Sequence, residues 1–287
     1  MALLAGCWVI AAPAHADRLG QLDDPGDAVP GHAGMSYLYL IRLAVPTLAL
    51  SPDDHRVEGH PPRPQPRHIA GDDYEGEPTD PLTLGPIEDL RIRVGGQPRI
   101  ALLADLGRDK ERQQGVALLI LMTDEPAPRV LDMADVAVDK DTFFALQPVL
   151  RLGPGDDALV THSSHDDSDP AVGDDTIDEF LLISTAGDHF VLVNMIRLAS
   201  EQACGWRGVQ TPTYATHPDP GHAYRRIDLT VRSVFTNPPG ECGPGRIIKA
   251  DVHTYRASFR WNAALRRFEG RLDDLKRLED FDERLFK

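Results

Sequence analysis

Apolar and polar residues alternate along much of the chain after residue 89, and this alternation predicts strands. Leu90, Ile92 and Val94 alternate with Arg91 and Arg93, as in a strand with one buried face. Residues 115–122 are apolar throughout, as expected for a strand that is buried on both faces. Further strands are predicted at 98–106, 129–138, 143–152, 178–185, 189–198, 226–235, 248–261 and 266–268.

Short turn sequences connect these segments. Gly95-Gly96, Ala186-Gly187-Asp188 and Asn262-Ala263-Ala264-Leu265 each separate two apolar runs, as in a β-hairpin. Strands joined in this way usually pair as antiparallel neighbours. A single open sheet of about ten strands is unusual, because large twisted sheets curl or split. We therefore expect a mostly β protein, an antiparallel meander that forms a sandwich or a curled barrel. A β-propeller would require a repeat of about 40–50 residues, and none is visible.

Near the C-terminus, the apolar positions change once from even-numbered to odd-numbered residues. Ile248 and Val252 are at even-numbered positions, whereas Tyr255 and Phe259 are at odd-numbered positions. A β-bulge near His253-Thr254 would account for this change.

Two further apolar segments lie nearer the two ends of the chain. Apolar residues at spacings of three and four predict one helix, at Arg271–Phe286. Ser36–Leu50 is also apolar, and its Tyr37–Ile41 run favours a strand, because aromatic and β-branched residues are frequent in strands. Arg42 and Pro46 interrupt this stretch, so we expect no transmembrane segment there.

Irregular, polar segments flank Ser36–Leu50. Residues 17–34 are rich in Asp, Gly and Pro and are predicted to be a flexible leader. Residues 51–86 are Pro-rich and are predicted to be a long surface loop within a single β domain, 35–287, with a domain boundary as the alternative. The histidines and aspartates of this loop match no closed zinc pattern in their spacing: His55, His60, His68, Asp53, Asp54, Asp72 and Asp73.

The first 16 residues predict export. Residues 1–12 are apolar and uncharged, and Ala14-His15-Ala16 forms a small-x-small cleavage site before Asp17. We therefore predict a signal peptide over 1–16 and a periplasmic or secreted mature protein. Two alternatives stay open: a lipobox at Leu4-Ala5-Gly6-Cys7, in which Cys7 would be lipidated, and a buried N-terminal strand.

Removal of residues 1–16 leaves two cysteines, Cys204 and Cys242. An even number of cysteines in an oxidising compartment predicts a disulfide, with two free buried thiols as the alternative. On the chain-entropy model, a bridge that closes a loop of about 39 residues stabilises the fold by roughly 4 kcal/mol.

The net charge of −15 is distributed unevenly. Residues 225–287 hold 14 Lys and Arg against 10 Asp and Glu, whereas residues 152–196 hold ten acidic residues and no basic one. An acidic surface repels nucleic acids and anionic lipids and attracts cations. We therefore expect no nucleic-acid partner.

The acidic stretch contains the candidate metal ligands. Closely spaced carboxylates are the hard oxygen ligands that calcium prefers. The spacing is not that of an EF-hand, because its third ligand position falls on Ala171. His162 and His165 could bind a transition metal, and a solvated acidic loop between two strands is the other interpretation. The predicted cofactor is therefore none or calcium, with these candidate ligands: Asp166, Asp167, Asp169, Asp174 and Asp175.

Motifs for catalysis are sparse. The chain has no Gly-x-Ser-x-Gly elbow, and Ser163 and Ser164 lie between two histidines without the spacing of a known triad. A glycosidase carboxylate pair could form across a cleft, but nothing in the sequence selects it. A cluster near the C-terminus could line a carbohydrate or anion groove, or form core on one face and solvated charge on the other: Tyr255, Arg256, Phe259, Arg260, Trp261, Arg266, Arg267 and Phe268.

These features favour a non-enzymatic exported envelope protein, a binding or structural module whose partner is an envelope ligand or protein. The leader and the late Trp261-Asn262 hairpin resemble those of exported bacterial β proteins, and this resemblance implies a compartment and no activity. The alternative is an exported hydrolase that acts on a glycan or a peptide. A hydrolase requires a cleft in which titratable groups converge with shifted pKa values.

Overall fold

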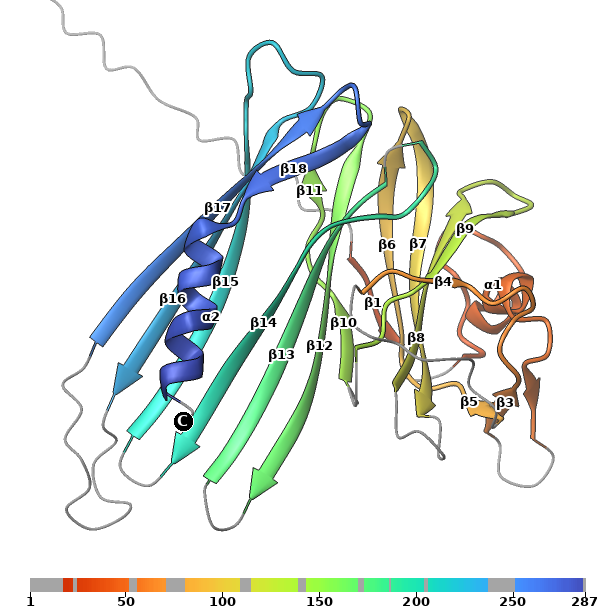
Figure 1. Ribbon diagram of the computed structural model, residues 1–287. Helices are drawn as coiled ribbons and strands as arrows, with labels where there is room; N and C mark the ends of the chain where they lie inside the picture. The colour runs from red at the N-terminus through yellow and green to blue at the C-terminus, as the bar shows by residue number, and fades with distance from the viewer. Residues whose placement is uncertain are drawn as a thin grey trace, which may run out of the picture.

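The computed structural model confirms a mostly β, antiparallel architecture with a C-terminal helix (Figure 1). It describes residues 18–22, 25–51, 56–70, 81–108, 115–138, 143–169, 173–185, 187–203, 206–236 and 251–285.

The larger sheet forms the C-terminal half of the molecule. All its pairs are antiparallel and, except for the short strand β11, its strands follow the chain order, so the predicted meander is confirmed. Strand β18 contacts β14 and strand β11 contacts β15, although neither pair is adjacent in the sheet, which shows that this sheet curls. Its nine strands are β10 (Phe143–Leu146), β11 (Leu150–Arg151), β12 (Asp157–Asp169), β13 (Gly173–Ser184), β14 (Val191–Ala203), β15 (Trp206–His217), β16 (Arg226–Thr236), β17 (Asp251–Asn262) and β18 (Arg267–Arg271).

Two further sheets form the N-terminal half. Strand β4 runs parallel to β9, and the other described pairs in these sheets are antiparallel. The six-stranded sheet contains, in spatial order, β1 (Arg18–Leu22), β6 (Ile87–Val94), β7 (Gln97–Arg108), β8 (Gly115–Thr123), β9 (Val130–Asp135) and β4 (Arg67–His68). The three-stranded sheet contains β2 (Ala49–Leu50), β3 (Val57–Gly59) and β5 (Leu82–Thr83).

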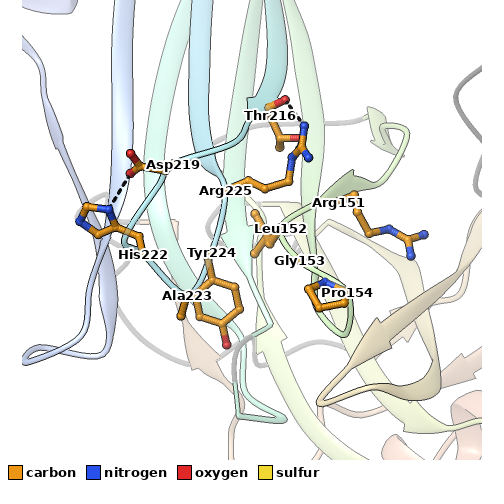
Figure 2. A pocket seen from close by; sticks show the side chains of 10 residues that line it. All are labelled: Arg151, Leu152, Gly153, Pro154, Thr216, Asp219, His222, Ala223, Tyr224 and Arg225. Atoms are coloured by element: carbon orange, nitrogen blue, oxygen red, sulfur yellow. Dashed lines mark hydrogen bonds and ion pairs between the residues drawn. The ribbon is translucent and has the colours of Figure 1, made fainter. Parts of the chain in front are cut away.

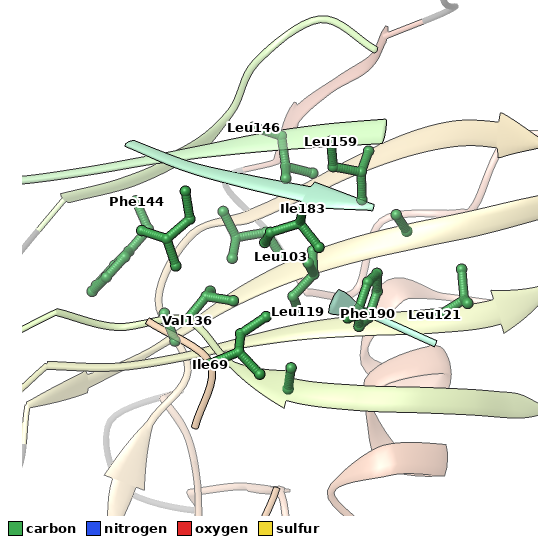
Figure 3. Packing of buried hydrophobic residues seen from close by; sticks show 14 of the residues in the cluster. Ile69, Leu103, Leu119, Leu121, Val136, Phe144, Leu146, Leu159, Ile183 and Phe190 are labelled. Atoms are coloured by element: carbon green, nitrogen blue, oxygen red, sulfur yellow. The ribbon is translucent and has the colours of Figure 1, made fainter. Parts of the chain in front are cut away.

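The two large sheets pack face to face around one apolar core. Leu103 and Leu119 of the six-stranded sheet meet Leu159 and Ile183 of the nine-stranded sheet, and Phe190 is fully buried among them (Figure 3). Helix α1 and the three-stranded sheet cover the outer face of the six-stranded sheet, and helix α2 packs against the face of the nine-stranded sheet that points away from the six-stranded sheet (Figure 1). The fold is therefore a sandwich whose larger sheet is curled.

Hydrogen bonds also join the sheets at one end. The backbone N–H of Arg93 donates to Asp157 Oδ2 at 2.8 Å, and that of Gly96 donates to the carbonyl of Gly155 at 2.8 Å. A Cβ on Gly155 would lie 2.8 Å from the Gly96 nitrogen, so the close approach of the two turns requires glycine. This junction positions the segment between β11 and β12.

The predicted strand at Ser36–Leu50 is wrong. The segment forms helix α1 (Tyr37–Ala44), with the Ser36 Oγ accepting a hydrogen bond from the Tyr39 backbone N–H at 3.2 Å. Every third or fourth residue of the helix is buried, from Tyr37 to Ala44, so helical periodicity decides the structure over β-propensity.

The irregular segments are more structured than the sequence predicts. In the expected leader, Arg18–Leu22 forms β1 on the edge of the six-stranded sheet, and Val29 and His32 are buried. The described parts of the Pro-rich segment 51–86 supply the short strands β3, β4 and β5. Backbone pairing along sheet edges explains this order, because edge strands offer unpaired backbone groups to any extended segment.

The predicted turns occur, whereas the predicted bulge does not. Gly95 and Gly96 have positive φ angles between β6 and β7, and Arg266 has one between β17 and β18. Pairing between β16 and β17 runs without a register shift from Phe259 to Asp251, and the Val252 side chain is 52% exposed. Val252 is thus an apolar residue on the solvent face. Helix α2 (Asp273–Leu285) confirms the C-terminal helix.

Cys204 and Cys242 lie outside the described residues, so the disulfide stays a prediction. Arg207 pairs with Thr236 at the end of the sheet where the chain leaves β14 and β16. The two cysteines follow these strand ends within a few residues, which supports the pairing. We expect the Cys204→Ser/Cys242→Ser variant to unfold with a free energy lower by roughly 4 kcal/mol in denaturant titrations. Two thiols that alkylate in the native wild-type protein would contradict the bridge.

Candidate functional site

A cleft opens at the end of the nine-stranded sheet, between the segment after β11 and the loop that joins β15 to β16 (Figure 2). Its volume is about 690 Å³, a typical size for a small-molecule site. The cleft is lined by Arg151, Leu152, Gly153, Pro154, Thr216, Asp219, His222, Ala223, Tyr224 and Arg225.

Arg225 holds the two walls of the cleft together. Its backbone N–H donates to the carbonyl of Leu152 at 2.7 Å. Its guanidinium donates from Nε to Thr216 Oγ1 at 3.2 Å and from Nη2 to the Thr216 carbonyl at 3.0 Å. A guanidinium carries five N–H donors, so Arg225 can hold the wall and also donate to a bound anion.

Asp219 organises the outer wall. Its carboxylate is 8% exposed, and its Oδ2 lies 3.2 Å from His222 Nδ1 (Figure 2). The same oxygen lies 3.7 Å from Arg260 Nε. The Asp219 carbonyl also accepts the backbone N–H of His222 at 3.1 Å, which closes the turn. The buried carboxylate thereby orients one histidine and one arginine toward the solvent side of the cleft.

Aromatic rings form the side of the cleft nearest the β17–β18 hairpin. The Tyr224 ring meets the Trp261 ring edge-on, with centroids 4.6 Å apart, and Trp261 packs against the buried Phe268 at 5.3 Å. Burial raises the pKa of Tyr224, and the charge and hydrogen bond of Asp156 raise it further. The Tyr224 hydroxyl therefore stays protonated at neutral pH.

Two further hollows adjoin the cleft. The first, of about 480 Å³, shares His222 and Ala223 with it and is also lined by Gly221, Arg260, Trp261, Asn262, Ala263 and Glu269. The second, of about 620 Å³, shares Arg260 and Glu269 with the first and is also lined by Ser258, Gly270 and Arg271. The three hollows thus follow one another around the loop and across β17 and β18.

Positive charge is concentrated around these hollows. Arg151 and Arg260 are about half exposed, at 49% and 57%, and Arg271 is also exposed, although Arg151 Nε is paired with the buried Asp157 Oδ1 at 2.8 Å. Glu269 is held by the Asn262 amide at 2.8 Å and by Arg267 at 2.9 Å, and these two bonds lower the pKa of Glu269. The site therefore presents arginines on a chain whose net charge is −15.

The described residues around the hollows form neither a glycosidase acid at Glu269 nor a triad at Ser258. A glycosidase requires an acid with a raised pKa, but the pKa of Glu269 is lowered. Ser258 Oγ donates to Asp228 Oδ1 at 2.5 Å, and His217 Nε2 lies 3.6 Å from Asp228 Oδ2. The carboxylate thus lies between serine and histidine, whereas a triad places the histidine in the middle.

The acidic stretch lies mostly in strands rather than in a loop. Asp167 pairs with Asp175 across β12 and β13, and Asp175 pairs with Glu201 of β14. Like charges at paired positions repel each other and destabilise a sheet, and a bound cation would reduce this repulsion. Asp166 is engaged by the Thr176 hydroxyl at 2.9 Å. The side chains of the other candidates lie outside the described residues, so calcium stays a prediction: Asp167, Asp169, Asp174 and Asp175.

The histidines of this stretch do not form a site together. His162 and His165 are three residues apart on β12, so they face opposite sides of the sheet. His162 Nε2 lies 2.7 Å from Asp178 Oδ1, and its ring stacks on Phe180 with centroids 4.4 Å apart. Ser163 is buried on the opposite face from His162. The structure therefore brings His162 together with neither His165 nor Ser163.

The polar set of the Pro-rich segment is similarly dispersed. His68 Nδ1 lies 3.3 Å from Asp135 Oδ2, and His60 is exposed. The other members lie outside the described residues: His55, Asp53, Asp54, Asp72 and Asp73. Among the described residues, no three His, Cys, Asp or Glu side chains gather in a way that could hold a metal.

The C-terminal aromatic and basic cluster divides between core and site. Tyr255, Phe259 and Phe268 are buried, whereas Arg260 and Trp261 line the hollows. The other contributors could not be selected from local patterns, because the β11 segment and the β15–β16 loop meet only in the folded sheet: Arg151, Asp219, His222, Tyr224 and Arg225. The Pro-Asp-Pro-Gly run at 218–221 marks that loop as a turn and no more.

None of the described helices is long and apolar enough to cross a membrane. Comparison with known proteins finds no family model, no curated protein and no solved structure that matches this chain.

Proposed function

We propose that this chain is an exported binding module and that its cleft takes an anionic, carboxylate-bearing ligand. The observation that carries the proposal is the concentration of arginines beside partly exposed aromatic residues on an otherwise acidic protein. Guanidinium groups recognise carboxylates through paired, charge-assisted hydrogen bonds. The acidic remainder of the surface repels other polyanions and so restricts anion binding to this end.

Export is the second part of the proposal. The apolar, uncharged residues 1–12 and the Ala14-His15-Ala16 cleavage signal support it. Cleavage after Ala16 would retain every described element, because the first of them begins at Arg18. N-terminal sequencing of the native protein should begin at Asp17, and an intact Met1 would rule out export.

Arg260→Gln is expected to weaken the binding of trigalacturonate by about tenfold or more, since a hydrogen bond to a charged group contributes about 1.5–3 kcal/mol. Calorimetric titration measures the dissociation constants of the wild type and the variant, with neutral galactotriose as the ligand control. Arg232→Gln is the matched protein control, because Arg232 is an exposed arginine of β16 that lines none of the three hollows. Equal affinity for the neutral and the anionic trisaccharide would refute the proposal.

A further inference from the structure

We infer that the ligand is an extended acidic glycan, one chain of which crosses all three hollows. This inference rests on the proposed function and specifies its substrate class. The first observation is size. The hollows measure about 690, 480 and 620 Å³, and each alone has the volume of an ordinary small-molecule site. Three adjacent sites with shared walls fit a ligand made of repeated units.

The second observation is the repetition of the same chemistry along this path. Arg225 lies at the cleft beside Arg151, whose Nε is paired with Asp157 Oδ1 at 2.8 Å; Arg260 borders the second and third hollows, and Arg271 lines the third. Ser258 pairs with Arg271 across β17 and β18, and Arg260 pairs with Glu269. These alternate positions lie on one face of the hairpin and line the third hollow. A polymer with a carboxylate on each unit would meet an arginine in each hollow.

The third observation is the aromatic pair in the middle of the path. Tyr224 lines the cleft and Trp261 lines the second hollow, and the two rings are in edge-to-face contact. Trp261 keeps part of its ring exposed while Phe268 supports it from the core. A rigid, supported indole offers an apolar surface at little entropic cost, which suits the C–H face of a sugar ring. Flat nucleobases would also stack there, so nucleic acid must be tested as a competitor.

The test is a calorimetric length series of oligogalacturonates, from the monomer to the hexamer, on the full processed chain. We expect the affinity to rise by at least about tenfold between the monomer and the tetramer, the equivalent of about 1.4 kcal/mol. Arg271→Gln should weaken binding of the hexamer and leave the dimer unchanged, whereas Arg260→Gln should weaken both. Trp261→Ala should weaken the binding of every oligomer longer than the monomer. Trp261→Phe, which keeps an aromatic ring packed on Phe268, should weaken it less.

The outcomes separate the two claims. Equal affinity for the monomer and the hexamer, with no effect of Arg271→Gln, would overturn the extended-chain inference and leave the anion site intact. Failure of every galacturonate to bind would overturn the proposed function. A single-stranded oligonucleotide that binds as tightly as the hexamer would show recognition of any polyanion, which contradicts an acidic glycan as the ligand.

Discussion

Phe190→Ala is expected to lower the free energy of unfolding by about 3–5 kcal/mol, the usual cost of removing a buried Phe side chain. Phe190 is fully buried where the two large sheets meet, and its backbone N–H donates to Asp132 Oδ2 at 2.7 Å (Figure 3). The cavity left by the substitution would lie in the shared core, so both sheets should lose stability together.

The measurement is denaturant unfolding followed by circular dichroism and by tryptophan fluorescence. We expect both probes to report a single unfolding transition, because one core joins residues of both sheets. The variant should move this transition to lower denaturant concentration and keep it single. Phe143→Ala is the control: this ring is 44% exposed at the start of β10, and its loss should cost far less. Two separate transitions in the wild-type protein would contradict the single β domain.

Asp89→Asn is expected to stabilise the protein at neutral pH by about 1–3 kcal/mol. Burial raises the pKa of Asp89 from 3.8 to about 6, although hydrogen bonding from the Tyr37 hydroxyl at 3.2 Å and the charge of Arg91 partly oppose this rise. The folded state therefore binds the proton more tightly than the unfolded state does. This contribution to stability is complete below pH 4 and disappears as the pH rises through about 6, at about 1.4 kcal/mol per pKa unit.

The measurement is the free energy of unfolding at pH 4.5 and pH 7.5 for the wild type and the variant. The variant should gain stability relative to the wild type at pH 7.5 and little at pH 4.5, where Asp89 is already protonated in the fold. Burial also raises the pKa of Asp105 to about 6, so Asp105→Asn should act over the same pH range and add to the effect. Glu58→Gln, at an exposed position of β3, is the neutral control. A variant that is equally or less stable at pH 7.5 would contradict a buried, energetically costly charge at Asp89.

The β architecture could be predicted because its signals are local. Alternation at Leu90–Val94 and the glycines at 95 and 96 determine one strand and its turn within a few residues. The helix at Tyr37–Ala44 was missed because composition suggested a strand, whereas the Ser36 cap and the buried helical stripe decide the structure. The bulge was predicted because Val252 is apolar, but a single exposed apolar residue is ordinary on a protein surface.

The candidate site depends on contacts that no local pattern encodes. Arg225 reaches Leu152 from a loop more than seventy residues further along the chain. Arg260 and Trp261 stood out in the sequence as basic and aromatic residues, and the pairing of β16 with β17, with Ile227 opposite Phe259, places them beside the loop of His222. The arrangement of charge could be anticipated in outline, since residues 225–287 are basic in an acidic chain. The cleft itself depends on the short strand β11, which pairs with β12 and contacts β15 out of chain order, and no local pattern predicts that contact.

A fluorescence titration of the processed protein tests the central claim most directly. Of the three tryptophans, Trp8 lies in the predicted signal peptide and Trp206 begins β15 at the end of the sheet opposite the cleft. The Trp206→Phe variant of residues 17–287 therefore reports on Trp261 alone. We predict a saturable change of its emission with trigalacturonate, weakened by salt and by Arg260→Gln, and none with galactotriose. An emission spectrum that trigalacturonate leaves unchanged up to millimolar concentrations would contradict an anion site at this cleft.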